Sequence, residues 1–273
     1  MAVKISVKRK SQLTYAAVIV GSLLVSSFIL RTFVYQSMVM SADSMSNTIS
    51  INDKVISDVL IYKFNRPKIG DVVMFHAPPA ATSGKEIDLI KRCIAVEGDS
   101  VEVTPPRVMD GNREIDSIEM TGMDWHRLLR EVLTNQEGSV KFTNDGVCID
   151  GSPTLTIDDF QQTLKTKIDE YTKANGPSLS VSMASRLVEA GKNLKIIPGK
   201  TLVNGKELSE PYIREDPDYV MSPTTIGKDE LFVLGDNRNF SHDSHMWGPL
   251  AVNRVFGRVV ARYSDQGPLQ FGL

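Results

Sequence analysis

Short runs of alternating or uninterrupted apolar residues, bounded by turn residues, occupy both the early and the late part of the chain and predict strands there. These runs are 54–60, 71–75, 89–96, 100–103, 200–203, 231–234 and 255–263. Turn residues separate them, and Asn204-Gly205 is the strongest hairpin signal among these. We therefore expect both parts to be mainly β.

The segment 104–198 has a different pattern. Amphipathic spacing predicts helices at 123–133 and 157–174, and the remaining runs predict a hairpin at 140–149 and a strand at 179–183. Thr156 is the predicted N-cap of the second helix. The pattern indicates a small α+β module of unknown role, inserted into a β-rich domain that is made from 32–103 and 199–273.

The amino-terminal part contains 18 consecutive uncharged residues, 13–30, preceded by Lys8-Arg9-Lys10 and followed by Arg31. As a helix this run would span about 27 Å, close to the thickness of the hydrocarbon core of a bilayer. A cleavable signal peptide has a shorter apolar region and a small-x-small cleavage site. We predict a retained, single transmembrane helix at 13–31 after a basic cytoplasmic tail at 1–12. The excess of positive charge on the amino-terminal side then places the rest of the chain on the outer face of the cell (cytoplasmic) membrane.

Composition and charge narrow the function further. The chain has 273 residues, of which 41% are hydrophobic and 23% charged, and this excludes a disordered or multi-span protein. The net charge of −2 gives no basic field for nucleic acid. The first 31 residues contain five basic residues and no acid, so the predicted outer domain is acidic. The only two cysteines, Cys93 and Cys148, could form one disulfide or remain two separate thiols.

The sequence contains no recognisable histidine that could act as the general base of a hydrolase. No common hydrolase elbow, zinc, phosphate or dinucleotide motif occurs, and none of the four histidines lies in a motif that marks a general base. A lysine serves instead when its pKa falls from about 10.4 towards neutrality. Lys91 lies in the apolar run 88–96, and Leu89, Cys93 and Ala95 would share its face of a strand. An edge-strand lysine that opposes aggregation is an equally good interpretation.

Three segments, in this order after the predicted anchor, resemble the type I signal peptidases, membrane-bound Ser/Lys endopeptidases that remove signal peptides. The resemblance rests on Ser44-Met45-x-x-Thr48, on Lys91-Arg92 followed by Ile94-Ala95-Val96-Glu97-Gly98-Asp99, and on Gly235-Asp236-Asn237-Arg238-x-x-Ser241-x-Asp243-Ser244. It covers about 13–103 and 199–263 and leaves the insert uncovered. It implies a mainly β, signal-peptidase-like catalytic domain.

The resemblance also implies roles for individual residues. Ser44 would be the nucleophile and Lys91 the general base, with neither metal nor organic cofactor. Ser241 would hydrogen-bond Lys91 and orient it, a part that a third residue plays in other nucleophile–base pairs. Asp243 and Arg238 would brace their loop.

Substrate selection follows from the same resemblance. The family binds its peptide as an added strand, and Met40 and Ile90 match the positions that line the pocket before the cut, where a small residue such as alanine is preferred. The sequence departs from the family at Ala42, which replaces a serine, at Asn47, which replaces a proline, and at His245, which replaces an arginine. At Ala42 a second donor to the oxyanion is missing or comes from elsewhere. The changes at Asn47 and His245 remove no catalytic group but are expected to loosen the structure around the site.

The predicted function is removal of amino-terminal signal peptides from exported preproteins by an endopeptidase that is anchored in the lipid bilayer. The oligomeric state is left open, and no nucleic-acid partner is expected. The alternative is a catalytically weakened homologue that acts as an anchored binding protein for exported chains. A Ser/Lys self-cleaving repressor would carry a helix-turn-helix and a basic face, neither of which is visible in the sequence.

Overall fold

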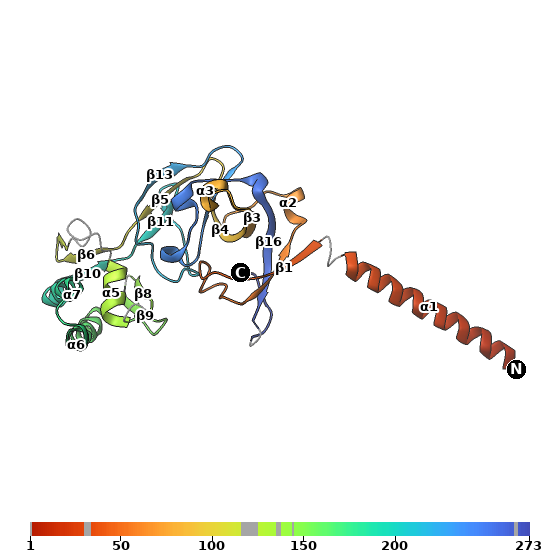
Figure 1. The fold of residues 1–273 in the computed structure, drawn as a ribbon, viewed down its shortest axis with the longest axis horizontal. Coiled ribbons are helices and arrows are strands. Elements are labelled where there is room, and N and C mark those ends of the chain that lie inside the picture. The colour runs from red at the N-terminus through yellow and green to blue at the C-terminus, as the bar shows by residue number, and fades with distance from the viewer. Residues whose placement is uncertain (1, 30–33, 116–124, 135–137, 144, 265–266) are drawn as a thin grey trace.

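A curled antiparallel sheet forms the centre of the molecule in the computed structural model, which describes residues 2–29, 34–115, 125–134, 138–143, 145–264 and 267–273 (Figure 1). The strand order is β1-β2-β16-β3-β4-β14-β15, with β17 beside β16. The strands are β1 (Tyr35–Val39), β2 (Lys54–Asp58), β3 (Val72–His76), β4 (Asp88–Val96), β14 (Glu230–Leu234), β15 (Leu250–Ala251), β16 (Val255–Tyr263) and β17 (Gln270–Phe271).

A second sheet has the order β12-β11-β5-β13 and extends the first towards the insert. Its strands are β5 (Ser100–Thr104), β11 (Lys200–Val203), β12 (Lys206–Glu207) and β13 (Met221–Thr225). The Asn204-Gly205 hairpin is confirmed, because Val203 pairs with Lys206 and both turn residues have positive φ. Each of the seven runs in which we predicted a strand overlaps a strand of the structure.

Strands β1 and β13 were not predicted, and there is a physical reason why the pattern of each is weak. In β1 only Met38 is even partly buried, so the strand lacks a clear apolar face. In β13 a proline, Pro223, interrupts the pattern, and the register shifts between Met221 and Thr224. Both strands lie at the edge of their sheets, where the hydrophobic signal of a strand is weakest.

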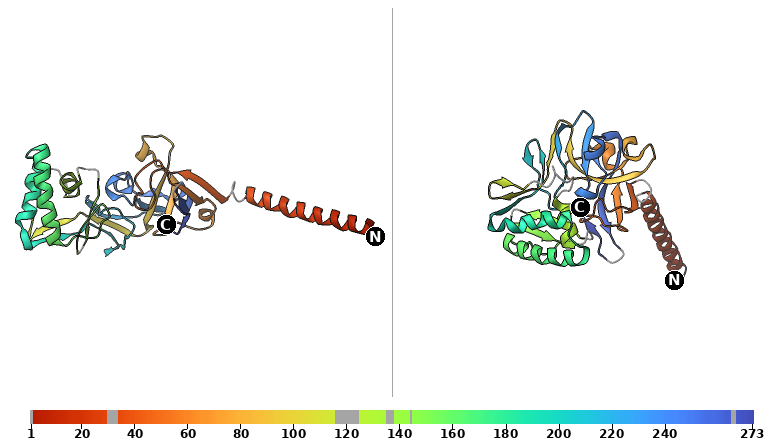
Figure 2. Two further views of the ribbon diagram at one scale, coloured as in Figure 1. Left: turned by 90° about the horizontal axis from the view of Figure 1, so that it is seen from below. Right: turned by 60° about the vertical axis from the view of Figure 1, so that its left-hand side comes forward.

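The segment between β5 and β11 has its own hydrophobic core, whose buried residues lie between Val108 and Ile196. Its helices are grouped at the end of the molecule opposite α1 (Figure 2). Its elements are β6 (Arg107–Asp110), β7 (Arg113–Glu114), α5 (Trp125–Thr134), β8 (Val140–Thr143), β9 (Gly146–Ile149), α6 (Ile157–Asn175), α7 (Leu179–Glu189), η2 (Gly191–Asn193) and β10 (Leu194–Ile197).

Two helices of the insert and the β8–β9 hairpin agree with the prediction, but the strand predicted at 179–183 is wrong. These residues begin helix α7, whose N-cap Ser178 accepts a hydrogen bond from the Val181 amide. Met183, Ala184 and Leu187 are buried on one face of that helix. Five residues were too few to show this period, because a helical face repeats only over 7–11 residues. The N-cap predicted at Thr156 is confirmed, since its side chain accepts from the Asp159 amide.

The remaining helices are short, apart from the first. They are α1 (Ala2–Ile29), α2 (Ile61–Phe64), α3 (Pro79–Thr82), η3 (Arg238–Phe240), α8 (Ser244–Trp247) and η4 (Val252–Arg254). The membrane-spanning helix predicted at 13–31 is not supported: in the part of the chain that the structure describes, no helix combines the length and the apolar character needed to cross a bilayer. The last residues of that prediction, 30 and 31, lie outside the described residues.

Candidate active site

Ser44 lies in a tight series of turns that follows β1, and two apolar anchors hold this loop in place. Met45 and Ile49 are fully buried in the core, and the amides of Thr48 and Ile49 both donate to the Met45 carbonyl. The hydroxyl of Ser44 therefore has a fixed position beside the sheet. We call residues 43–48 the nucleophile loop.

Lys91 meets Ser44 from strand β4. The lysine Nζ donates to the Ser44 Oγ over 2.7 Å and to the Ile90 carbonyl over 3.1 Å. Lys91 is only 3% exposed, so its charge is not presented to solvent, and the interpretation as a lysine that protects an edge strand against aggregation is wrong. The sheet thus brings together two residues that are 47 positions apart.

Burial also changes the proton affinity of this lysine. Desolvation lowers the pKa of Lys91 to about 8, although the negative charges of Asp243 and Asp236 oppose that shift. At neutral pH roughly a tenth of the amine is then unprotonated, compared with less than a thousandth for a lysine in water. A neutral Nζ at this distance from the Ser44 Oγ has a lone pair that can accept a proton from a hydroxyl.

The loop 235–244, which follows β14, packs against the nucleophile loop. The Asn237 amide donates to the Ser44 carbonyl over 3.1 Å, and its side chain donates to Asp43. Arg238 is fully buried and donates to the Gly235 carbonyl, to Thr201 and to both oxygens of Glu210. These bonds tie the loop to the second sheet as well as to itself.

Asp243 closes the same loop. Its Oδ2 accepts from the Gly235 amide over 2.8 Å, and its Oδ1 lies 2.7 Å from His245 Nδ1. The His245 ring stacks on Tyr219, with centroids 4.1 Å apart. The residue that replaces the family's arginine therefore still provides a partner for Asp243. The expectation of a looser structure at this position is not supported.

Ser241 does not make the hydrogen bond that we expected. Its Oγ is buried without a hydrogen-bond partner among the described residues, whereas Lys91 donates to Ser44 and to a backbone carbonyl. The Ser241 hydroxyl instead lies against Gly235, where an added Cβ would come within 2.3 Å of the Ser241 Oγ and 2.4 Å of the Ser44 carbonyl. Gly235 is thus required for the close approach of the two loops, a role that no local pattern in the sequence indicates.

An adjacent network of charges was also missed. Arg92 and Asp236 form a buried bidentate pair, with Nε–Oδ1 and Nη2–Oδ2 distances of 2.9 and 2.7 Å. Thr48 donates to the same carboxylate, and the Arg92 guanidinium lies over the Tyr212 ring at 3.9 Å. The sequence signal was the adjacency of Lys91 and Arg92, because alternate residues of a strand face opposite sides. Through its pair with Asp236, Arg92 thereby holds the loop 235–244 in place next to β4.

Met40 and Ile90 lie in one apolar cluster with Met45 and Met74. Beside this cluster, a cavity of about 550 Å³ is lined by Gln36, Ser37, Met38, Ile56, Met74, Asp88 and Tyr35. It runs between β1 and the beginning of β4. There β4 pairs only with β3, since its pairing with β14 begins at Arg92. The edge of β1 away from β2 is likewise free of any described strand. The backbone donors and acceptors of these two strand edges are therefore available to an extended peptide that lies in the cavity.

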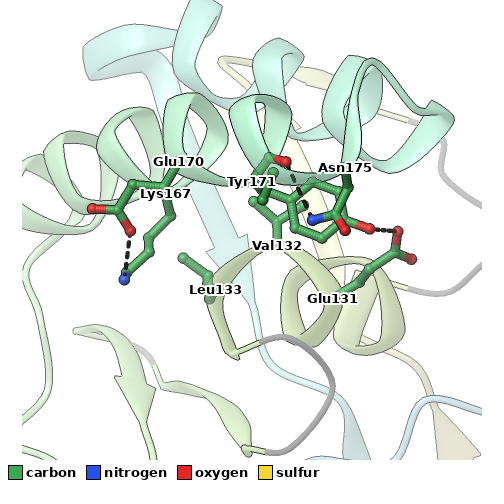
Figure 3. Close-up of a pocket in the computed structure, with 8 residues that line it drawn as sticks. Glu131, Val132, Leu133, Lys167, Glu170, Tyr171 and Asn175 are labelled. Atoms are coloured by element: carbon green, nitrogen blue, oxygen red, sulfur yellow. Dashed lines mark hydrogen bonds and ion pairs between the residues drawn. The ribbon is translucent and has the colours of Figure 1, made fainter.

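Other features of the structure lie away from this site. A cavity of about 500 Å³ between α5 and α6 is lined by Glu131, Lys167, Glu170 and Tyr171 among others, all from the insert (Figure 3). Within the described residues, no three His, Cys, Asp or Glu side chains are grouped so as to hold a metal ion. Cys93 and Cys148 are both unpaired, and burial raises the pKa of Cys93 to about 12.

A β fold in which a buried lysine contacts a serine, and in which a strand-lined cavity shares Met74 with the apolar cluster next to both residues, has the features of a peptidase. The chain belongs to the signal peptidase family, peptidase S26, whose family model matches residues 12–264.

Individual relatives agree with that family. A signal peptidase I from Leptolyngbya laminosa is 39% identical over 95 residues, which are 34% of this chain and 47% of that protein. A probable thylakoidal processing peptidase 2 from Arabidopsis thaliana is 26% identical over 224 residues, 81% of this chain and 35% of that protein. The chain thus spans less than half the length of these two relatives. A signal peptidase I from Aquifex aeolicus is 24% identical over 226 residues, 82% of this chain and 74% of that protein. A crystal structure of a signal peptidase I from Enterococcus faecalis aligns at 16% identity with a TM-score of 0.25, over 72% of this chain and 98% of that one.

Proposed function

We propose that this protein is a serine endopeptidase that removes amino-terminal signal peptides from preproteins, with Ser44 as nucleophile and Lys91 as general base. The observation that carries the proposal is the 2.7 Å contact between Lys91 Nζ and Ser44 Oγ at a buried position. A serine hydroxyl attacks a peptide bond only when a positioned base takes its proton.

The reaction then needs only these two side chains and water. Ser44 Oγ attacks the substrate carbonyl carbon while its proton passes to the neutral Lys91 amine, and the carbonyl electron pair moves onto oxygen. The tetrahedral intermediate collapses, the C–N bond breaks, and the Lys91 ammonium gives its proton to the leaving amine. Water, deprotonated by Lys91, hydrolyses the resulting ester and regenerates Ser44. The backbone amide of Ser44 would donate to the oxyanion, a contact often worth about 3 kcal/mol in the transition state.

The cavity between β1 and β4 would bind the substrate as an added strand. The side chain before the cut would then point towards Met40 and Ile90, which are buried in a packed apolar cluster, so a small side chain would fit there more easily than a large one. We therefore expect preproteins with alanine at this position to be cleaved, and those with leucine or phenylalanine to resist.

We also propose that the amino-terminal segment attaches the catalytic domain to a membrane, with the basic tail on the cytoplasmic side. The uncharged run 13–30 and the five basic residues around it support this location. Alkaline carbonate extraction tests it. The full chain should remain with the membranes and a variant lacking 1–31 should not; release of both would contradict the proposal.

Cleavage of a purified preprotein tests the mechanism directly. Ser44→Ala and Lys91→Ala should each lower the cleavage rate by at least about 10³-fold, since either change removes a participant in the proton transfer. Lys85→Ala and Ser222→Ala remove exposed residues of the same types and should leave the rate unchanged. A wild-type rate in the Ser44 or Lys91 variants would exclude the mechanism.

The alternative function is that of an anchored binding protein. Reaction with a serine-directed acylating inhibitor at alkaline pH distinguishes a peptidase from such a binding protein. A peptidase should be acylated at Ser44, whereas a binding protein should not react. The contacts made by Asn47 and His245 lend no support to a weakened site.

A further inference from the structure

The segment 211–218, which we call the strap, lies between the insert and the nucleophile loop. Its backbone and side chains contact both, and the Asp236 carbonyl accepts a hydrogen bond from the Arg214 amide in the middle of the strap. Residues 214–218 of the strap belong to none of the motifs that carried the family resemblance. Its contacts assign a role to the insert.

On the insert side, two adjacent buried carboxylates of the strap receive hydrogen bonds. Glu215, which is 1% exposed, accepts from Arg130 of α5 over 3.1 Å and from the Val140 amide of β8 over 2.8 Å. Asp216 accepts from the Phe142 amide of β8 over 2.9 Å. The strap therefore takes its position from α5 and from the first strand of the β8–β9 hairpin.

On the site side, the strap holds residues on both sides of the nucleophile. The Asn47 side chain donates to the carbonyls of Tyr212 and Ile213, at 2.9 and 3.3 Å. Arg214 donates to the side chains of Asp43 and Ser46, each over 3.2 Å. Asn47 has φ 84°, a left-handed conformation that a proline cannot adopt. Asn47, which we expected to loosen the loop, instead connects it to the strap.

The loop 235–244 joins the same assembly. The side-chain nitrogen of Asn239 (Nδ2) donates to the Glu215 carboxylate over 3.1 Å and to the Asp216 carbonyl over 3.0 Å. Glu215 is thus the point at which the insert, the strap and the second site loop meet. The cluster of buried apolar residues in the insert contains no residue of the site, so polar contacts carry this connection.

We propose that the insert positions Ser44 for catalysis through the strap, and that Glu215 is a positioning residue at the junction. This inference rests on the proposed function and deepens it. A buried carboxylate with three donors has one favourable location, because moving it leaves the donors and the charge without partners. A displacement of about 1 Å at a nucleophile can cost two orders of magnitude in rate.

The test compares Glu215→Gln in the strap with Glu131→Gln, the same change at a carboxylate of the insert that has no hydrogen bond to the strap among the described residues. Glu131 accepts hydrogen bonds from Tyr171 and Ser180, within the insert. We expect Glu215→Gln to lower kcat per folded molecule at least about tenfold with KM within twofold, and Glu131→Gln to leave both unchanged. The folded fraction is taken from the unfolding curve, so a loss of stability alone would not lower the corrected kcat.

Hydrogen exchange of the backbone amides of residues 43–48 gives a second measurement that does not depend on activity. Exchange in this loop should be at least about fivefold faster in Glu215→Gln than in Glu131→Gln. If Glu215→Gln does not fold, Lys141→Met removes the insert's bond to the Ile213 carbonyl and should shift both measurements in the same direction. Unchanged exchange, or unchanged kcat in a cleaving enzyme, would overturn the positioning role. A wild-type protein that cleaves no signal peptide would overturn the proposed function alone, since the exchange comparison still decides the role of Glu215.

Discussion

At the scale of single residues, the properties of Lys91 follow from its burial between strand β4 and the nucleophile loop. Burial disfavours the ammonium form, and the same burial supplies the neutral amine that a general base requires. The nearby carboxylates of Asp236 and Asp243 limit the shift and keep the pKa of Lys91 near 8. The residue is thus a poor contributor to stability for the same reason that it suits catalysis.

The pH dependence of cleavage should report this pKa. Because only the neutral amine accepts the serine proton, kcat/KM should rise about tenfold per pH unit below pH 8 and level off above it. The measurement is initial rates of preprotein cleavage between pH 6 and about 9.5. An inflection near pH 6.5 would indicate a histidine base and contradict the assignment.

The same pKa predicts an effect on stability. The folded-state pKa of about 8 lies below the unfolded value of about 10.4, so unfolding takes up a proton between these values and wild-type stability rises with pH there. Below pH 8 the full cost of burying the charge is present. Lys91→Met should therefore raise the free energy of unfolding at pH 7 by about 1–3 kcal/mol.

Urea denaturation measures this difference, which should shrink as the pH approaches 10. Lys85→Met, at an exposed position, is the control and should show no such change. A less stable Lys91→Met protein at pH 7 would mean that the lysine is stabilised by its contacts more than it is destabilised by burial.

At the scale of elements, the site depends on how closely two loops approach each other. The nucleophile loop and the loop 235–244 meet at Gly235, where no side chain would fit. Strands β1 and β2 fix the ends of the nucleophile loop, and β14 fixes the start of the loop 235–244, but the contact between the two loops depends on a single missing Cβ. The glycine is needed for space here, since its φ is not in the left-handed region.

Gly235→Ala should therefore lower both activity and stability. The new Cβ would overlap the Ser241 Oγ and the Ser44 carbonyl, so we expect kcat to fall by about 10² and the free energy of unfolding by about 2 kcal/mol. Gly227→Ala is the matched control. Its Cβ would meet only the Glu230 side chain, which can move, and the expected loss of stability is under about 1 kcal/mol. Equal effects of the two changes would argue against a packing role for Gly235.

At the scale of the whole molecule, the insert leaves and rejoins the catalytic domain at one place. Thr104 of β5 pairs directly with Lys200 of β11, so the two ends of the insert are neighbours across a ladder. The insert has a core of its own, and its contacts with the strap are polar. The insert thus has the features of a separate folding unit, and hydrogen bonds to the strap connect it to the site.

Replacing 105–199 by an Asn-Gly turn should give a folded catalytic domain with reduced activity. The β5–β11 register closes with a two-residue turn, while Glu215 and Asp216 lose their partners in α5 and β8. We expect retained β circular dichroism and a kcat at least about tenfold below that of the full chain. Full activity in the shortened protein would show that the insert serves another purpose.

Local patterns were sufficient for much of the fold. Alternation located seven strands, Asn204-Gly205 located a hairpin, and Thr156 located the start of α6, because each signal spans only a few neighbouring residues. The edge strand β1 and helix α7 were missed or misassigned, since one has little buried surface and the other was judged on too short a segment.

The sequence by itself also identified Ser44 and Lys91 as the residues to examine, because their motifs are local. Their contact, the free hydroxyl of Ser241 and the connection of Asn47 to the strap were decided only by the tertiary structure. Each of these depends on strand register and on the path of a loop between residues far apart in the chain. Such distances do not appear in any local period of hydrophobic and polar residues, so only the folded molecule defines them.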